Sequence, residues 1–192
     1  MTQNNVIVVG GGMVGAAMAI KLAQQGKSVR IIEKHLIDPP HVLSNDNVDI
    51  RVSAINRFSE KLLDGLGAMP ILRRGRIAPY QQLEAFERGD DKLLFDCADI
   101  NTTHLGHLIE NSLIQASLWM QFEQYDIEVI EQKQVVSKIE QNADSITLVY
   151  GEQRYTASLV VAADGGQSQL RTKANIGVTG WQYQQQCMGV LI

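Results

Sequence analysis

A glycine-rich loop near the start of the chain is the first feature that could do chemistry. Residues 8–15, VVGGGMVG, contain the spacing G-x-G-x-x-G between an apolar run and a segment with helical periodicity. Gly10 allows a tight turn, Gly12 leaves room for a pyrophosphate, and Gly15 lets the following helix pack closely on the strand. The loop therefore predicts a phosphate-binding turn.

The loop opens a helix and is followed by an acidic residue. Met13 and Val14 begin the helix, whose unpaired backbone N–H groups and positive dipole end attract phosphate. Glu33 ends the next expected strand, 23 positions after Gly10, and Lys34 follows it. A carboxylate there can accept hydrogen bonds from both hydroxyls of a ribose. Together these residues predict a site for the ADP part of a dinucleotide.

The charge of Glu33 also discriminates between dinucleotides. A 2′-phosphate about 4 Å away would be repelled by about 1 kcal/mol in water and by about 4 kcal/mol at a protein-like dielectric, which argues against NADP in this site. The simpler alternative is a glycine-rich turn with a surface acid. The loop by itself does not distinguish FAD from NAD.

A second turn with a fixed carboxylate lies late in the chain. An apolar run leads into Asp164 and Gly165, and Ser168 and Arg171 open a helix after them. The pattern D-G-x-x-S-x-x-R resembles the second fingerprint of flavoprotein aromatic hydroxylases. The resemblance implies that this turn contacts FAD and is linked to NAD(P)H handling. Because both motifs occur in one chain, it favours FAD over NAD in the glycine-loop site.

Further segments resemble the ubiquinone-pathway hydroxylases of this family. Residues 49–55, DIRVSAI, look like the segment that places an arginine, here Arg51, against the flavin. Residues 105–119 look like a helix with the motifs L-G-x-x-x-E-N and Q-x-x-L-W, which implies flavin contacts for Asn111 and Gln115. Many other aromatic hydroxylases have an arginine where Asn111 falls, and the alternative for this helix is a packing role.

Two local strings narrow the resemblance within the family. Residues 79–84, PYQQLE, and residues 177–188 are most similar to the hydroxylases that act on 2-octaprenyl-3-methyl-6-methoxy-1,4-benzoquinol. The implied activity is an FAD-dependent monooxygenation: NAD(P)H reduces FAD, the reduced flavin reacts with oxygen, and one oxygen atom enters a phenolic ring. The implied substrate is a polyprenyl phenol or quinol. Because the cofactor carries the chemistry, no acid–base catalyst is expected among these residues.

The resemblance also implies surroundings for the protein. We expect a cytoplasmic protein with peripheral contact at the inner membrane, where the polyprenyl tail of the substrate would lie. A homo-oligomer or a ubiquinone-synthesis complex stays open. Two other functions stay open as well: a NAD-dependent dehydrogenase, and a non-catalytic nucleotide-binding fragment or assembly component.

The order of the strands and helices expected around these residues predicts the fold: an α/β, Rossmann-like FAD-binding domain with an inserted β region. Residues 6–9, 13–25 and 29–32 read as strand, helix and strand, the opening of a doubly wound sheet, with Gly26 ending the helix. The other expected elements are a loop over 38–49, helices over 54–66 and 104–125, strands over 83–87 and 93–96, antiparallel strands over 129–139, 146–150 and 154–157, and a buried strand over 159–163.

The extent of the chain gives a further expectation. Residues 1–192 read as one FAD-binding domain, in which residues 68–104 begin a substrate-side β region. The apolar run 187–192 predicts a strand that no turn closes. The family's third fingerprint, which meets the ribityl chain of the flavin, is not found. We therefore expect a C-terminally truncated part of a longer hydroxylase that has almost no turnover by itself.

Composition excludes other classes of protein and of site. With 45% hydrophobic and 20% charged residues the chain is ordinary globular material, and a formal net charge of −4 argues against a nucleic-acid partner. His104 and His107 lie three apart, but no third ligand is evident, so no metal is expected. Arg73, Arg74 and Arg76 form a small basic cluster that reads as surface, with anionic lipid or a nicotinamide cofactor as alternatives.

Overall fold

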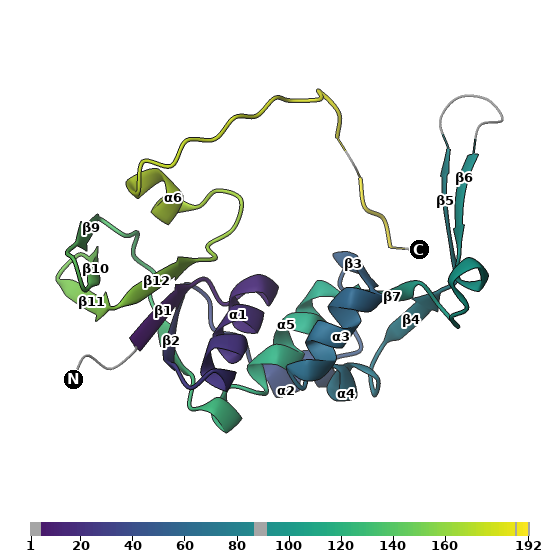
Figure 1. Ribbon diagram of the computed structural model, residues 1–192, viewed down its shortest axis with the longest axis horizontal. Coiled ribbons are helices and arrows are strands. Elements are labelled where there is room, and N and C mark those ends of the chain that lie inside the picture. Colours follow the sequence, from purple (N-terminus) through teal and green to yellow (C-terminus); the bar gives the residue numbers. More distant parts are fainter. Residues whose placement is uncertain (1–4, 87–91, 187, 192) are drawn as a thin grey trace.

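A four-stranded parallel sheet forms the frame of the molecule. The computed structural model describes residues 5–86, 92–186 and 188–191 (Figure 1). The strand order is β12-β1-β2-β8, and all neighbours run parallel. The strands are β1 (Asn5–Val9), β2 (Ser28–Glu33), β8 (Glu128–Glu131) and β12 (Leu159–Ala162). The predicted doubly wound α/β fold is confirmed, and its strands end at one common edge.

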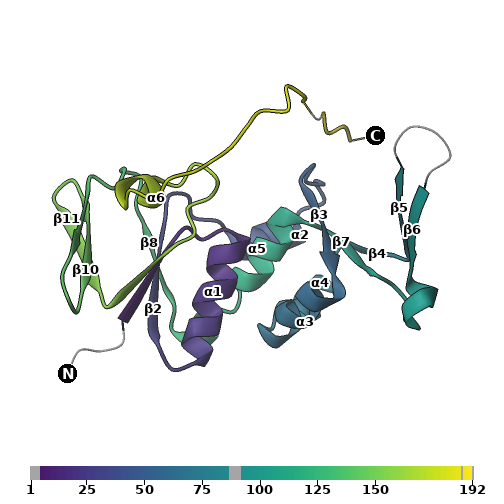
Figure 2. The ribbon, with the colours of Figure 1, turned by 45° about the horizontal axis from the view of Figure 1, so that its top comes forward.

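Both faces of the parallel sheet are covered, which explains the continuous apolar run of β1. Val6 and Val8 pack toward helix α1 (Met13–Gln24), which ends where Gly26 adopts the expected positive φ of 77°. Ile7 and Val9 face a three-stranded antiparallel sheet on the opposite side (Figure 2). That sheet has the order β11-β10-β9 and comprises β9 (Lys138–Gln141), β10 (Ile146–Tyr150) and β11 (Gln153–Ala157).

A second three-stranded antiparallel sheet lies apart from the parallel sheet. Its order is β3-β7-β4, with β3 (Val52–Asn56), β4 (Ile77–Tyr80) and β7 (Gly106–Glu110). The hairpin of β5 (Gln82–Phe86) and β6 (Lys92–Asp96) projects beyond it (Figures 1 and 2). The remaining helical elements are α2 (Pro39–Ser44), α3 (Arg57–Gly65), α4 (Met69–Leu72), the 3-10 turns Cys97–Ile100 and Glu123–Tyr125, α5 (Asn111–Trp119) and α6 (Gln169–Lys173).

The prediction of one long helix over residues 104–125 was wrong. Its first part, Gly106–Glu110, is the central strand β7, and α5 begins only at Asn111. A side chain at Gly106 would lie 2.0 Å from the carbonyl oxygen of Ile55, so the close strand approach depends on this glycine. Pairing with β3 and β4 on both sides satisfies the backbone of β7 and overrides the helical periodicity of its apolar residues.

Three other boundaries differ from the prediction. The helix expected over 54–66 begins at Arg57, because residues 52–56 join β3 and the Asn56 side chain caps the helix by accepting from Ser59 N–H at 2.9 Å. The loop expected over 38–49 contains α2, with Asp38 as its cap and Pro39 in its first turn. The strand expected over 129–139 is two strands in two sheets, β8 and β9.

The end of the chain also differs from the prediction. Residues 188–191 form no strand, and residues 87, 187 and 192 of the predicted strands lie outside the described residues. After α6 the chain runs as an extended segment back toward β3 (Figure 1), where Gly189 lies against Ile50. Among the residues described, no helix combines the length and apolar character needed to cross a membrane. The role of residues 68–104 as a substrate-side region stays a prediction.

An ion pair between the half-buried Arg76 and the buried Glu110 connects the antiparallel sheet to the loop before β3. Arg76 holds Glu110 through two bonds, Nε to Oε1 at 2.8 Å and Nη2 to Oε2 at 3.2 Å. Arg76 also donates to the carbonyls of Asn45 and Asn47, and Glu110 accepts from the Asp49 N–H at 2.7 Å. The prediction of a basic surface cluster therefore holds for Arg73 and Arg74, which are exposed, but not for Arg76, whose side chain belongs to this internal network.

Candidate functional site

A pocket of about 500 Å³ opens at the carboxyl ends of β1, β2 and β12. Its volume lies in the usual range of small-molecule sites, and its position is the edge where doubly wound sheets bind ligands. Half of the predicted site residues line it: Gly10, Gly12, Glu33, Lys34, Asp164 and Gly165. The topology thus brings the early and late glycine turns, about 150 residues apart, to one cavity.

The three glycines of the motif have separate geometric roles. Gly10 has a φ of 103°, and a side chain there would lie 2.3 Å from the carbonyl oxygen of Ala163. A side chain at Gly15 would lie 1.9 Å from the carbonyl oxygen of Gly10, which is the close helix-to-loop contact expected there. At Gly12 an added side chain meets nothing within 4 Å, so it would enter open space.

The start of α1 is available to an anion. Gly12 is the residue that precedes the helix, and no side chain caps it. Met13 and Val14 occupy the first turn, with Val14 74% exposed, and no acidic side chain lies in that turn. Neither residue lines the pocket itself. Their contribution would be the backbone N–H groups and the helix dipole.

Glu33 is held by backbone groups at the pocket wall. Its Oε2 accepts from Gly11 N–H at 2.5 Å, and its Oε1 accepts from the N–H groups of Lys34 and His35 at 2.8 and 3.0 Å. Two carboxylate oxygens offer about four acceptor positions, so these three bonds leave capacity for a ligand hydroxyl. The carboxylate is therefore oriented by the fold, and its bond to a ribose stays a prediction.

Asp164 organises the second turn. Its Oδ1 accepts from Ser168 Oγ at 2.5 Å, and its Oδ2 accepts from the N–H groups of Gln169 and Leu170. Ser168 in turn caps α6 by accepting from Arg171 N–H at 3.0 Å. Asp164 thus orders the helix start, which leaves Gly165, with a φ of 84° and open space around it, facing the pocket.

Helix α5 reaches the glycine loop from the other side. Gln115 Nε2 and Trp119 Nε1 both donate to the carbonyl oxygen of Gly11, at 2.9 and 2.7 Å. Asn111 lies at the first position of α5, where its Oδ1 accepts from Ser53 Oγ at 2.6 Å. Gln115 therefore shapes the loop, whereas Asn111 contacts the antiparallel sheet, and neither lines the pocket.

Arg51 also lies outside the pocket. Its N–H donates to Asp49 Oδ1 at 2.9 Å, its carbonyl accepts from Asn111 N–H, and the residue is exposed. The backbone N–H of Arg51 is the first cause of a pKa of Asp49 below its usual value. The structure brings Arg51 beside Asn111, away from the ADP side of the site, and their flavin contacts stay predictions.

Some residues of the site escaped the sequence analysis. Gly11 packs between Trp119 and Glu33, where a side chain would lie 2.7 Å from the indole. Tyr150 and Gln132 line the pocket from β10 and from the segment after β8. Burial, with the nearby charges of Asp164 and Tyr155, raises the pKa of Tyr150 to about 12, so its phenol stays neutral. The one available signal for Gly11 was its place in the middle of three consecutive glycines.

A family model supplies the decisive comparison. The model described as an FAD-binding domain matches residues 3–192, almost the whole chain. The chain belongs to this FAD-binding domain family. Within the FAD-binding domain, the open space at Gly12, the uncapped start of α1 and the oriented Glu33 together fit the phosphates and ribose of an ADP moiety.

Curated relatives are hydroxylases named for ubiquinone synthesis. The chain is 36% identical over 184 residues to the 3-demethoxyubiquinol 3-hydroxylase of Escherichia coli. This alignment covers 95% of the chain and 46% of the relative. The chain is 27% identical to the mitochondrial ubiquinone biosynthesis monooxygenase COQ6 of Dictyostelium discoideum, in an alignment that covers 96% of this chain and 41% of the relative. The chain therefore spans about half the length of these relatives or less.

Solved structures show the same fold. The p-nitrophenol 4-monooxygenase PnpA of Pseudomonas putida superposes with a TM-score of 0.68 at 22% identity, covering 90% of this chain and 44% of that one. The Diels-Alderase PyrE3 superposes with a TM-score of 0.70 at 19% identity, and the match covers 90% of this chain and 34% of PyrE3. Because these two proteins are named for different reactions, the likeness supports only the fold of the FAD-binding domain, and its chemistry has to be argued from the site.

Proposed function

We propose that this chain is the FAD-binding part of a monooxygenase that hydroxylates the aromatic ring of a polyprenylated ubiquinone precursor, with NAD(P)H as reductant. The observation that carries the proposal is the meeting of both glycine turns at one pocket, in a chain 36% identical to a 3-demethoxyubiquinol 3-hydroxylase. Bound FAD would supply the redox and oxygen chemistry. The residues of the chain would bind it, orient it and limit water around it.

Each group at the pocket has a defined part in this proposal. Glu33 would accept from the ribose hydroxyls of the adenosine, and the first turn of α1 would face the pyrophosphate across Gly12. Gly165 would let the middle of the cofactor approach the second turn without a side chain between them. Arg51, just before β3, and Asn111, at the start of α5, lie outside the pocket and would contact the flavin end. Peripheral contact with the inner membrane, and a homo-oligomer or synthesis complex, belong to the same proposal.

A titration tests the cofactor assignment first. The chain is titrated with FAD, followed by quenching of flavin fluorescence, and in parallel with NAD by calorimetry. Saturable FAD binding with little NAD binding is the expected result. Tight NAD binding without FAD binding would support the dehydrogenase alternative, which the named relatives do not favour.

The hydroxylation itself needs a separate assay. The chain, and any longer protein in which it occurs, is supplied with FAD, NAD(P)H and a demethoxyubiquinol analogue, and the hydroxylated product is measured by mass spectrometry. Product that carries one atom from ¹⁸O-labelled oxygen is expected from the longer protein, with almost no turnover by this chain alone. FAD binding in the longer protein without any such product would overturn the substrate assignment and leave the cofactor assignment standing.

A further inference from the structure

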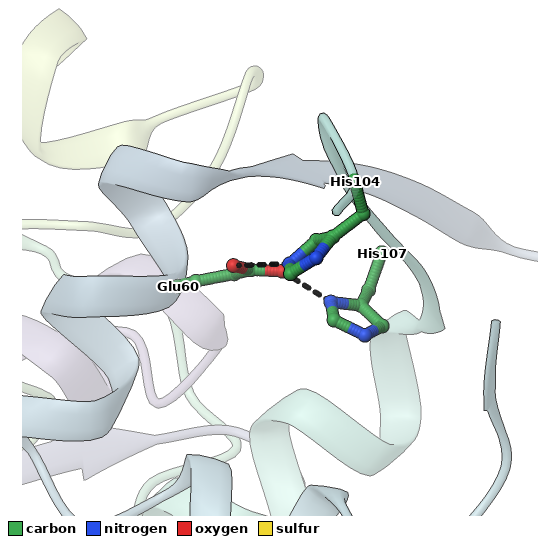
Figure 3. Close-up of side chains that lie close together, drawn as sticks. All are labelled: Glu60, His104 and His107. Carbon is green, nitrogen blue, oxygen red and sulfur yellow. Dashed lines mark hydrogen bonds and ion pairs between the residues drawn. The ribbon is translucent and has the colours of Figure 1, made fainter. Parts of the chain in front are cut away.

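Three side chains able to bind a metal ion meet far from the glycine-loop pocket. Glu60 comes from the first turn of α3, His104 from the loop before β7, and His107 from β7 itself (Figure 3). One ligand atom of each residue lies within 4.8 Å of the other two. Their side chains are 13%, 21% and 15% exposed, so the cluster is largely screened from bulk water.

Regular structure holds the three groups in place. His107 lies on the central strand of its sheet, paired on both sides. Glu60 is fixed by a helix whose start is capped by Asn56. The carbonyl of His104 accepts from Thr102 Oγ1 at 3.1 Å, which fixes the loop. A site that draws its groups from a strand, a helix start and a bonded loop is preorganised, so ligand binding needs little rearrangement.

The hydrogen bonds orient the imidazoles for coordination. In Figure 3 both rings point at the same carboxylate: His107 Nδ1 meets Oε1, and His104 Nε2 lies 3.2 Å from Oε2. The other nitrogen of His104, Nδ1, lies 2.9 Å from Thr103 Oγ1. A proton on Nδ1 donated to Thr103 would leave the Nε2 lone pair facing the cluster, which is how histidines that bind metals are usually held.

The charges of the cluster favour a cation. Glu60 contributes a carboxylate whose two oxygens face the two imidazoles, and its side chain is only 13% exposed. The two imidazole centroids are only 4.7 Å apart, so two protonated rings would repel each other. A divalent cation can take the place of protons shared between these rings and the carboxylate.

We propose that Glu60, His104 and His107 bind a divalent transition-metal ion of the Zn²⁺ type. Two imidazoles and one carboxylate are a ligand set that holds Zn²⁺ in proteins, with water in the fourth position. The ion ties α3 to β7 and stabilises the packing of that helix against the sheet. This role is independent of the proposed flavin chemistry.

Calorimetric titration of the metal-free, tag-free chain with Zn²⁺ tests the site. The expected result is one ion per chain, with affinity at least about tenfold weaker in each of Glu60→Gln, His104→Gln and His107→Gln, since even loss of a supporting contact costs about 10–100-fold. His41→Gln removes an exposed histidine of α2 and should bind like the parent.

Two further measurements keep the test decisive if a variant folds poorly. Co²⁺ added to the unaltered chain should give the visible bands of a tetrahedral complex, and Zn²⁺ should raise the melting temperature of the parent and of His41→Gln but not of Glu60→Gln. Absence of both effects, or equal Zn²⁺ affinity in parent and cluster variants, would overturn the proposal. FAD titration of the same samples is expected to be unchanged.

Discussion

At the residue scale, two glycines of one motif are needed for opposite reasons. A side chain at Gly15 would overlap the Gly10 carbonyl, whereas one at Gly12 would occupy empty space at the start of α1. We expect Gly15→Ala to destabilise the fold by about 1–3 kcal/mol through overpacking. Gly12→Ala should leave the melting temperature nearly unchanged and weaken FAD binding strongly. Thermal unfolding and FAD titration measure the two effects, and equal behaviour of both variants would contradict this division.

The Glu33 carboxylate gives a second prediction at this scale. A charge-assisted hydrogen bond is worth about 1.5–3 kcal/mol, so Glu33→Gln should weaken FAD binding at least about tenfold with the fold intact. Glu131 faces Glu33 in register on β8 but lies outside the pocket, which makes Glu131→Gln the matched control. Fluorescence titration and circular dichroism are the measurements. An unchanged dissociation constant for Glu33→Gln would mean that the ribose lies elsewhere.

At the scale of elements, the Arg76–Glu110 pair determines how the loop before β3 meets the sheet. Glu110 is 5% exposed, so Arg76→Met would leave a buried charge without its partner. The Arg76 side chain is 37% exposed and water screens the pair, so the expected cost is about 1–3 kcal/mol, the cost of leaving a buried hydrogen-bonding group unsatisfied. Arg74→Met, at an exposed position two residues earlier, should change the free energy of unfolding by less than about 0.5 kcal/mol. Urea denaturation of both variants checks this, and equal losses would show that the pair is dispensable.

At the scale of the whole molecule, several carboxylates make stability depend on pH. The hydrogen bond from Arg76 lowers the pKa of Glu110, and the backbone N–H of Arg51 lowers the pKa of Asp49. Burial raises the pKa of Glu60, but its hydrogen bonds with His107 and His104 lower it by more. Unfolded, these groups have ordinary values of 4.5 for Glu and 3.8 for Asp, so the unfolded chain binds more protons in acid. Their stabilisation is complete at neutral pH and is lost as the pH falls below about 4.5 and through the folded values.

Urea denaturation between pH 7 and pH 3 measures this dependence. The free energy of unfolding should fall steadily with acid, and the difference between the parent and Glu110→Gln should shrink, because protonation removes in the parent what the substitution removes in the variant. Parallel curves for the two proteins would contradict the assignment of this pH dependence to Glu110.

The sequence by itself determined the features that depend on a few neighbouring residues. The turn at Gly10, the helix that ends at Gly26 and the strand that carries Glu33 follow from short-range rules of backbone freedom and apolar patterning. The second turn at Asp164 was also visible in neighbouring residues, and the resemblance to aromatic hydroxylases linked it to FAD. These local rules were sufficient for the Rossmann-like fold, and half of the site residues predicted from the sequence line the pocket.

Only the tertiary structure decided what depends on partners far away in the chain. Gly106–Glu110 looks helical alone and becomes a strand because β3 and β4 pair with it. Gln115 and Trp119 reach Gly11 across 104 and 108 positions, and Glu60 reaches the two histidines across 44 and 47. Such contacts depend on how elements pack, and the packing is set by the burial of the whole apolar surface, which periodicity in one segment does not encode.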